Sequence, residues 1–270
     1  LTWGILIAVF GMRIIFPLAI VAIAAQIGPW SAVMLAAHEP QEYSRAMHEA
    51  HLSITAFGGT FLMMVALSYF IDHEKDVDWL KALEGKLRAC ASLRGLEVAF
   101  VLVIVLVVAS SLPGDKGAEF LFAAVLGMVT FLGVELLGRV LDRADAADGI
   151  ARAGGLGAFL YLEVLDASFS FDGVIGAFAL TQNLFLIAIG LGIGAFYVRS
   201  MTIMLVEKGT LAHFRYLEHG AFYSILVLAV IMYLQSMVHV HEMITGLIGA
   251  CLIGLALFSS IRYNRKERRG

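Results

Sequence analysis

The chain has 270 residues, of which 60% are hydrophobic and only 15% are charged, and its mean hydropathy is +0.86. A soluble domain has about 25% charged residues, so this composition excludes an ordinary soluble globular protein and places the chain in a membrane. The formal net charge of −3 gives no indication of nucleic-acid binding, and we expect no nucleic-acid partner.

Eight stretches are apolar over the length that a membrane-spanning helix needs, about 20 residues. Backbone polar groups in lipid must be satisfied within the segment, so runs of this length predict helices and not strands. We therefore expect an all-α, polytopic membrane protein with spans at about 2–25, 52–71, 96–112, 118–138, 156–180, 182–206, 218–237 and 243–261.

Basic residues are unevenly divided between the two sides of these spans. One side holds 15 of the 19 Lys and Arg residues, and the other holds only Arg45 and Lys116. The basic side consists of the loops 72–95, 139–155 and 207–221 and the tail 262–270. Because basic loops stay in the cytoplasm, we expect a protein of the cytoplasmic (inner) membrane with a cytoplasmic C-terminus. The basic tail is interpreted as a topology anchor at anionic headgroups.

Three carboxylates, Glu163, Asp166 and Asp172, lie within the apolar segment 156–180. An acidic side chain at the bilayer centre costs about 2.5–3.5 kcal/mol, so three of them indicate a bound positive charge. On a continuous helix, Glu163, Asp166 and Ser170 share one face, whereas Asp172 lies opposite. Asp172 joins the others only if the helix unwinds near Gly173, which also frees backbone carbonyls as ligands.

The segment therefore predicts a metal site formed by Glu163, Asp166, Asp172, Ser168 and Ser170. Carboxylate and hydroxyl oxygens suit Mn²⁺, Ca²⁺ and Mg²⁺ better than softer metals. We expect this ion to be transported, and we expect no permanently bound cofactor.

Two arginines, Arg13 and Arg199, also lie inside predicted spans, each after a glycine-containing apolar stretch. We interpret them as charge-compensating residues for the ion site; permanent structural pairing with the acids is the alternative. Their similar settings indicate an inverted repeat, as in secondary transporters. The predicted parts of the single transmembrane domain 1–270 are a remainder of the first repeat (1–71), a linking helix pair (96–138), a second repeat (156–237) and a last span with the basic tail (243–270).

Histidines and one acid gather in two loops on the predicted extracytoplasmic side. They suggest a vestibule for metal release, although plain solvated surface is the favoured interpretation. The residues are His48, His51, His239, His241 and Glu242.

Two further patterns predict local contacts. Glu135 precedes Arg139 by four residues, which predicts an ion pair on the helix surface. Two glycine series, Gly190-x-Gly192-x-Gly194 and Gly246, Gly249 and Gly254, predict close helix packing.

Three motifs resemble the second half of the TerC family, integral membrane proteins of the LysE-type exporter superfamily. They are Glu163-x-x-Asp166-x-x-Phe169-x-x-Asp172, Val198-Arg199-Ser200-Met201 and Tyr216-Leu217-x-x-Gly220. The resemblance is closest to a poorly characterised branch with Asp-Gly at Asp172-Gly173, where Gly173 replaces a commonly polar residue. The family's first acidic motif, a Glu helix ending in Asp-Asn, is absent. The resemblance thus implies a chain truncated before Leu1, a ninth span in the intact protein, and links to tellurium resistance and manganese efflux.

The expected function is a secondary transporter that exports divalent cations, Mn²⁺ above all, with proton or sodium influx as the driving force. The sequence has no Gly-x-x-x-x-Gly-Lys-Ser/Thr phosphate loop, so direct coupling to ATP is not expected. We do not expect an enzyme. Two alternatives stay open: a non-transporting membrane partner in stress resistance or protein insertion, and an intramembrane acid–base enzyme. The oligomeric state is not indicated.

Overall fold

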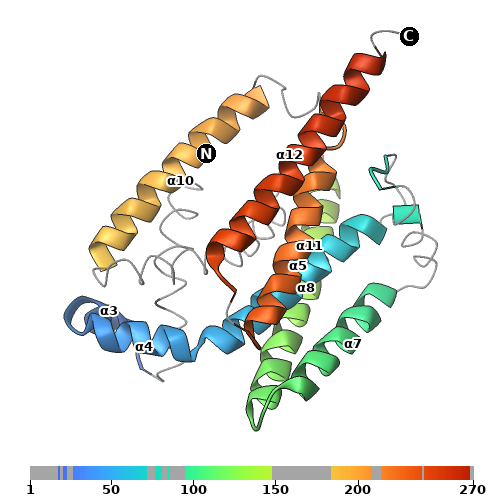
Figure 1. The fold of residues 1–270 in the computed structure, drawn as a ribbon. Helices are drawn as coiled ribbons and strands as arrows, with labels where there is room; N and C mark the ends of the chain where they lie inside the picture. The colour runs from blue at the N-terminus through green and yellow to red at the C-terminus, as the bar shows by residue number, and fades with distance from the viewer. Residues whose placement is uncertain are drawn as a thin grey trace. The chain divides into compact units, whose positions relative to one another are not determined.

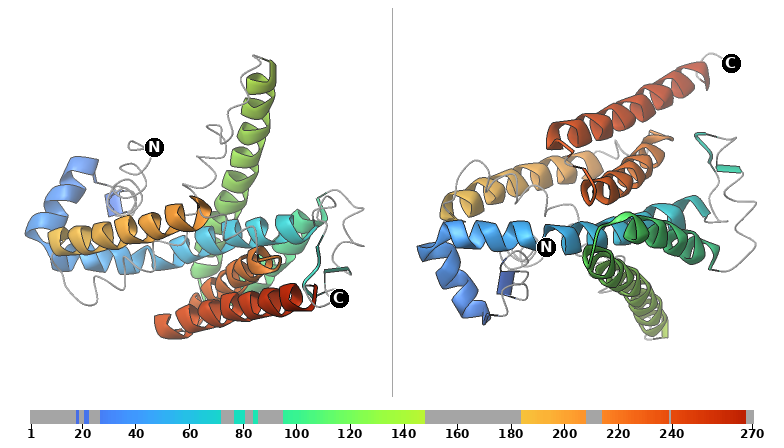
Figure 2. Two further views of the ribbon diagram at one scale, coloured as in Figure 1. Left: turned by 90° about the horizontal axis from the view of Figure 1, so that it is seen from above. Right: turned by 60° about the horizontal axis from the view of Figure 1, so that its bottom comes forward.

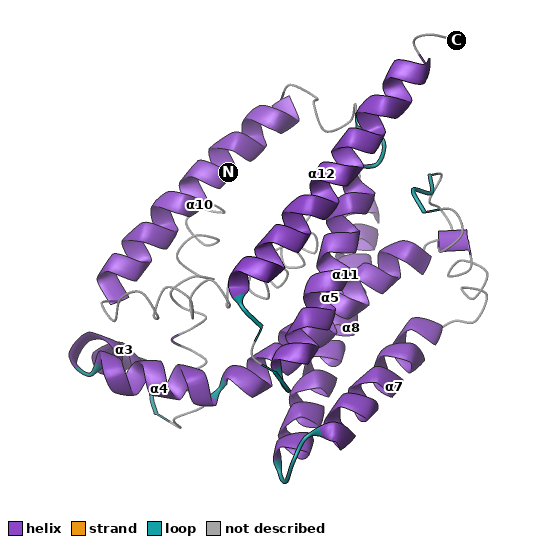
Figure 3. Ribbon diagram, in the orientation of Figure 1, coloured by secondary structure: helices purple, strands orange, loops and turns teal. Residues whose placement is uncertain are grey.

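The computed structural model describes residues 18, 21–22, 27–71, 77–80, 84–85, 95–147, 184–207, 214–238 and 240–267. It gives the backbone alone for residues 141–147, 184–185, 188, 199, 202–203, 205–207, 242 and 267. Throughout this part of the chain the regular structure is α-helical (Figure 3), as the composition predicts.

Eight helices are present in the described residues (Figure 1). They are α3 (Pro29–His38), α4 (Pro40–Glu49), α5 (His51–Ile71), α7 (Leu96–Ser111), α8 (Lys116–Ala147), α10 (Leu184–Glu207), α11 (Leu217–Gln235) and α12 (Glu242–Glu267).

Six of the eight predicted spans coincide with helices. Four of these helices, α5, α8, α11 and α12, are long and apolar enough to cross a membrane. The apolar helix α7 (Leu96–Ser111) and the apolar stretch Ile189–Val198 within α10 are shorter than these four. The chain is therefore an integral membrane protein with several apolar helices. The other two predicted spans, 2–25 and 156–180, lie almost wholly outside the described residues.

Residues 26–51 connect the first two predicted spans and were expected to form a loop, but they contain the two short helices α3 and α4. Pro29 and Pro40 stand at the first positions of these helices, where the missing N–H has no intrahelical partner and the fixed φ favours the helix. Each helix has 10 residues and is therefore about 15 Å long, which is too short to cross a bilayer.

The chain divides into two compact units, residues 1–54 with 129–201 and residues 55–128 with 202–270. These boundaries do not follow the predicted repeats. The repeat stays a prediction, because most of residues 156–183 in its second half lies outside the described part.

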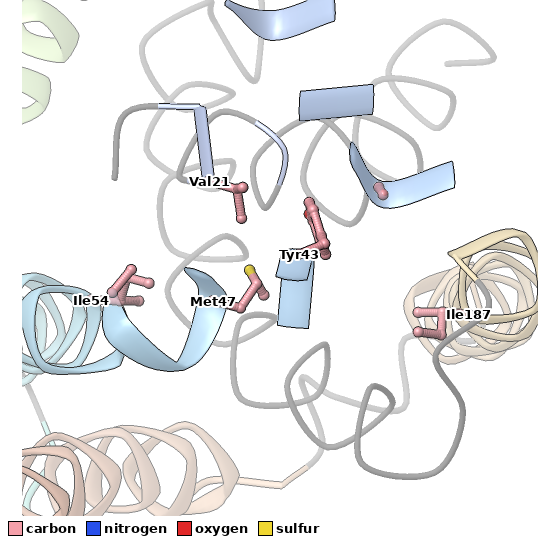
Figure 4. Packing of buried hydrophobic residues seen from close by; sticks show 7 residues of the cluster. Val21, Tyr43, Met47, Ile54 and Ile187 are labelled. Atoms are coloured by element: carbon pink, nitrogen blue, oxygen red, sulfur yellow. The ribbon is translucent and has the colours of Figure 1, made fainter. Parts of the chain in front are cut away.

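In the first unit, a small apolar core holds α4 in place (Figure 4). Tyr43 and Met47, one turn apart on α4, are buried in this core together with Val21, Ile54 and Ile187. Burial raises the pKa of the Tyr43 phenol above its ordinary range, so this hydroxyl stays protonated.

In the second unit, glycines bring α5 and its neighbours into close contact. A Cβ added at Gly59 of α5 would lie 3.1 Å from the Tyr233 ring of α11. Gly127 of α8 lies directly against the Phe57 carbonyl of α5. Small residues allow this approach, which matters in lipid, where burial of apolar surface does not drive helices together. These contacts make α5 the central helix of the unit, and 78% of its apolar window is buried.

The same pair of helices shares a buried hydrogen-bond chain. The Thr60 hydroxyl donates to the Ala56 carbonyl at 2.7 Å, so the Tyr233 hydroxyl donates to Thr60 at 2.8 Å. Thr60 and Tyr233 are both buried. The bond therefore satisfies two polar groups in the apolar interior and joins α5 to α11.

Helices α11 and α12 pack side by side, as Figures 1 and 2 show. Gly220 of α11 lies directly against the Ala256 side chain of α12. The Ser224 hydroxyl lies 3.3 Å from the Gly249 carbonyl across the same interface. Near its C-terminal end, α12 also accepts the backbone N–H of Tyr216 on the Ser260 hydroxyl at 2.9 Å.

The glycines singled out in the sequence are mostly not the ones that pack closely. Within the described part of the chain, nothing lies within 4 Å of a Cβ added at Gly190, Gly194, Gly246, Gly249 or Gly254. The prediction of close packing is therefore wrong at Gly190, Gly194, Gly246 and Gly254 for the described residues, whereas the Gly249 carbonyl meets Ser224 of α11. The spacing of glycines along one helix does not specify which of them a neighbouring helix approaches.

We expect Gly127→Ala to destabilise the protein by about 1–3 kcal/mol, because the new methyl group overlaps the Phe57 carbonyl of α5. Unfolding in detergent, followed by loss of helical circular dichroism, measures the effect. Gly133→Ala is the control on the same helix, since an added Cβ there meets no described atom within 4 Å. Equal stability of the two variants would contradict the close α5–α8 contact.

Candidate functional site

The predicted ion site lies outside the described residues. This applies to Glu163, Asp166, Ser168, Ser170 and Asp172, and also to Arg13. Arg199 lies on α10, but its side chain is not described. The predicted site therefore stays a prediction.

The predicted vestibule is described only in part. His48 near the end of α4 is exposed, and His51 begins α5. His241 is exposed just before α12, whereas His239 and the side chain of Glu242 are not described. A search of the described residues finds no group of three His, Cys, Asp or Glu residues that could hold a metal ion.

The described residues contain a different buried polar site, centred on Glu84. Its side chain is 0% exposed. It lies between the C-terminal end of α5, the segment 77–80 and the first turns of α11, and all of these belong to the second unit. We call Glu84, His219, Tyr223 and Tyr69, together with segment 77–80, the Glu84 cluster.

Three donors converge on one oxygen of the Glu84 carboxylate. The backbone N–H groups of Trp79 and Leu80 donate to Oε1 at 3.2 and 3.0 Å, and the Tyr223 hydroxyl donates to it at 3.0 Å. The Glu84 N–H in turn donates to the Leu80 carbonyl at 3.0 Å, which closes a helical turn. Donors aimed at a carboxylate stabilise its ionised form, so this arrangement favours a buried negative charge.

His219 supplies the other side of the cluster. Its Nε2 lies 3.6 Å from Oε2 of Glu84 and 2.7 Å from the Val77 carbonyl. Its Nδ1 lies 3.4 Å from the Tyr69 hydroxyl. His219 is 2% exposed, so water has little access to the imidazole. The ring therefore links the end of α5 with segment 77–80.

Aromatic rings enclose the cluster. Tyr69 stacks on Phe222 with ring centroids 3.7 Å apart and meets the His219 ring edge-on at 5.7 Å. Phe70 and Trp79 lie against Tyr223 at 4.5 and 5.7 Å. The rings exclude water, which strengthens each electrostatic interaction within the cluster.

The Glu84 cluster is not among the sites predicted from the sequence. Glu84 lies in the charged loop 72–95, where an acidic residue reads as solvated surface. Its partner Tyr223 is 139 residues away along the chain. The only signal in the sequence is the apolar pair Trp79-Leu80 within this loop, which indicates a segment that folds back onto the protein.

One local prediction is confirmed. Arg139 forms an ion pair with Glu135 on the surface of α8, as the spacing of four residues predicts. The Arg139 side chain is 69% exposed, so the pair contributes little to stability.

A model of the family described as "Protein of unknown function (DUF475)" matches residues 1–267 of the chain. No curated protein and no solved structure matches it significantly. The identification as a TerC-family protein is therefore wrong, because a different family accounts for nearly the whole sequence. Acidic residues in apolar helices recur wherever a membrane protein holds charge, so the quoted motifs were less specific than they looked.

We expect Glu84→Ala to destabilise the protein by about 3–5 kcal/mol, because the substitution leaves Trp79 N–H, Leu80 N–H and the Tyr223 hydroxyl without their acceptor. Chemical unfolding in detergent micelles measures the change. Glu218→Ala, an exposed acid beside His219, is the control and should stay within about 0.5 kcal/mol of the parent. An equal loss of unfolding free energy in both variants would show that the hydrogen bonds to Glu84 do not stabilise the protein.

Proposed function

We propose that this chain, which belongs to the DUF475 family of proteins of unknown function, is a secondary transporter that exports divalent cations. The observation that supports the proposal most strongly is the group of three carboxylates in the membrane-length segment 156–180 of an integral membrane protein. Acidic residues at membrane depth are costly and mark ion pathways in transporters.

The ion class follows from the ligands in this segment. Glu163, Asp166 and Asp172 supply carboxylates, and Ser168 and Ser170 supply hydroxyls. Hard oxygen donors of this kind bind Mg²⁺, Ca²⁺ and Mn²⁺. The preference for Mn²⁺ came from the TerC resemblance and falls with it, so the proposal names this class of ions and no single member.

The driving force in the proposal is an ion gradient. Export of a dication against an inside-negative potential costs about 4.6 kcal/mol per 100 mV, which is twice the value for one charge. Because the sequence lacks a phosphate-binding loop of the Gly-x-x-x-x-Gly-Lys-Ser/Thr type, influx of protons or sodium is the simplest source of this energy. The positive-inside distribution supports a protein of the cytoplasmic membrane, with the C-terminal tail in the cytoplasm.

The inverted repeat belongs to the same proposal. In secondary transporters, the ion site lies near the bilayer midplane, at the interface of two repeats of opposite topology. Arg13 and Arg199, one in each predicted repeat, are the residues proposed to neutralise the empty site. Their charges offset those of the acids until a cation displaces them.

An acid–base enzyme is the competing function, because Glu84, His219 and Tyr223 are residue types that transfer protons in enzymes. Glu84 and His219 are 0% and 2% exposed, and Tyr223 is 7% exposed. A substrate cannot touch groups buried this deeply, so their burial favours a role in holding charge or protons over direct catalysis. This observation supports a transporter over an enzyme.

In proteoliposomes, we expect Asp172→Asn to reduce Mn²⁺, Mg²⁺ or Ca²⁺ flux at least tenfold, because the site loses a charged ligand. Asp115→Asn makes the same chemical change at an exposed turn and should transport normally. A metal-sensitive dye inside the vesicles reports the flux at equal protein content. Normal flux by Asp172→Asn would refute an ion site in this segment.

The cation should also stabilise the purified protein. At a concentration of 100 times its dissociation constant, a bound ion adds about 2.7 kcal/mol to the free energy of unfolding. We expect this gain in thermal unfolding experiments with the parent chain and its loss in Glu163→Gln. A gain of the same size in the variant would place the binding elsewhere.

A further inference from the structure

The described groups around the buried Glu84–His219 pair argue against a metal ion as its positive partner. Oε1 of Glu84 already accepts three hydrogen bonds, from Trp79, Leu80 and Tyr223. The Val77 carbonyl can only accept, so Nε2 of His219, at 2.7 Å from it, carries a hydrogen and has no lone pair for a metal. The described residues around the pair therefore do not form a metal site. No group of three His, Cys, Asp or Glu residues in the described part of the chain could hold a metal ion.

The hydrogen bonds also define where a proton can be added. With Nε2–H donating to Val77, the neutral imidazole has its acceptor lone pair on Nδ1. The Tyr69 hydroxyl lies 3.4 Å from Nδ1. A hydroxyl donates to Nδ1 while the ring is neutral and accepts from Nδ1–H after it is protonated, so Tyr69 fits both states.

We infer that the Glu84–His219 pair is a proton-binding site that ties segment 77–80 to the ends of α5 and α11. One proton from solvent forms an N–H bond at Nδ1 of His219, no covalent bond within the protein breaks, and the Tyr69 hydroxyl turns from donor to acceptor. The charge of the pair changes from −1 to zero. The imidazolium then faces Oε2 of Glu84 at 3.6 Å.

The surroundings favour this protonation. Among the described residues, the titratable groups that face the pair are Tyr69 on α5, Asp78 in segment 77–80, and Tyr216, Glu218 and Tyr223 on or beside α11. Asp78 and Glu218 are acidic, and both act electrostatically on the tyrosines of the cluster. Nearby negative charge favours the imidazolium. Tyr69 is only partly buried, so it gives the proton a route to Nδ1 while Glu84 stays sealed.

Proton binding has a structural consequence. His219 contacts segment 77–80 through the Val77 carbonyl, and Glu84 contacts it through the N–H groups of Trp79 and Leu80. A charged hydrogen bond is stronger than a neutral one, so protonation tightens the bond to Val77 and adds an ion pair with Glu84. Loss of the proton at higher pH weakens the bond to Val77 and removes the positive charge that faces Glu84, which loosens the segment.

This inference stands apart from the transport proposal, because binding of a proton at equilibrium needs no transported ion. Under the positive-inside topology, the loops that meet here are cytoplasmic. A transporter that exchanges cations for protons has use for a proton site on that side. The titration described next still tests the pair if segment 156–180 proves to bind no metal.

The fluorescence of Trp79 should report protonation of the pair, because its ring lies 5.7 Å from the Tyr223 ring and its backbone N–H donates to Glu84. The chain has two other tryptophans, Trp3 and Trp30, which are replaced by Phe so that Trp79 alone emits. We expect the emission of the full-length protein in detergent to change in one protonation step between about pH 5 and pH 9, the range in which histidines titrate.

Two variants assign the step to the pair. His219→Gln keeps a donor for Val77 but cannot titrate, so the step should disappear. Glu84→Gln keeps the acceptor oxygen and removes the charge, so the step should move to lower pH. Glu84→Gln also serves where His219→Gln does not fold. His48→Gln removes an exposed histidine of the other unit and should leave the step unchanged.

The titration also has outcomes that overturn the inference. A step that persists in His219→Gln would place the proton elsewhere, and so would a step that does not move in Glu84→Gln. The absence of any step in the folded parent would show that the pair binds no proton in this range.

Discussion

A carboxylate that is removed from water persists only where hydrogen-bond donors surround it. The second unit of this membrane protein contains one such carboxylate, Glu84, beside α5 and α11. Glu84 receives donors from two backbone groups and from Tyr223, and it faces His219. These contacts join a loop segment to the ends of two membrane helices. Without them, the loop would leave a charge and several polar groups buried at a cost of several kcal/mol.

The helices themselves associate for a different reason. Lipid chains are as apolar as the helix surfaces, so close backbone approach and buried hydrogen bonds hold membrane helices together. Gly59 and Gly127 provide the close approach around α5, and the Thr60–Tyr233 bond provides the polar contact. These features fix how α5 and α11 meet, and the Glu84 cluster forms where this pair of helices ends. The burial of the Glu84 carboxylate therefore depends on packing that involves almost no charge.

The sequence predicted most of the described helices and little of the site. The bounds of α5, α7 and α11 differ from the predicted spans by at most two residues, because an apolar run ends where polar residues begin. The helices α8 and α12 run past their predicted ends, to Ala147 and Glu267, since polar residues continue a helix in water as readily as apolar ones do in lipid. The helices α3 and α4 were missed because ten residues are too few for a span.

By itself, the sequence determined that the chain is helical and lies in a membrane, because runs of about 20 apolar residues leave the backbone no other way to satisfy its polar groups. It also predicts carboxylates within the apolar segment 156–180. The tertiary structure alone decided that Glu84 and Tyr223, 139 residues apart, share a hydrogen bond and that His219 faces them. Hydropathy is a property of neighbouring residues, whereas a buried charge pair exists only after distant segments have met.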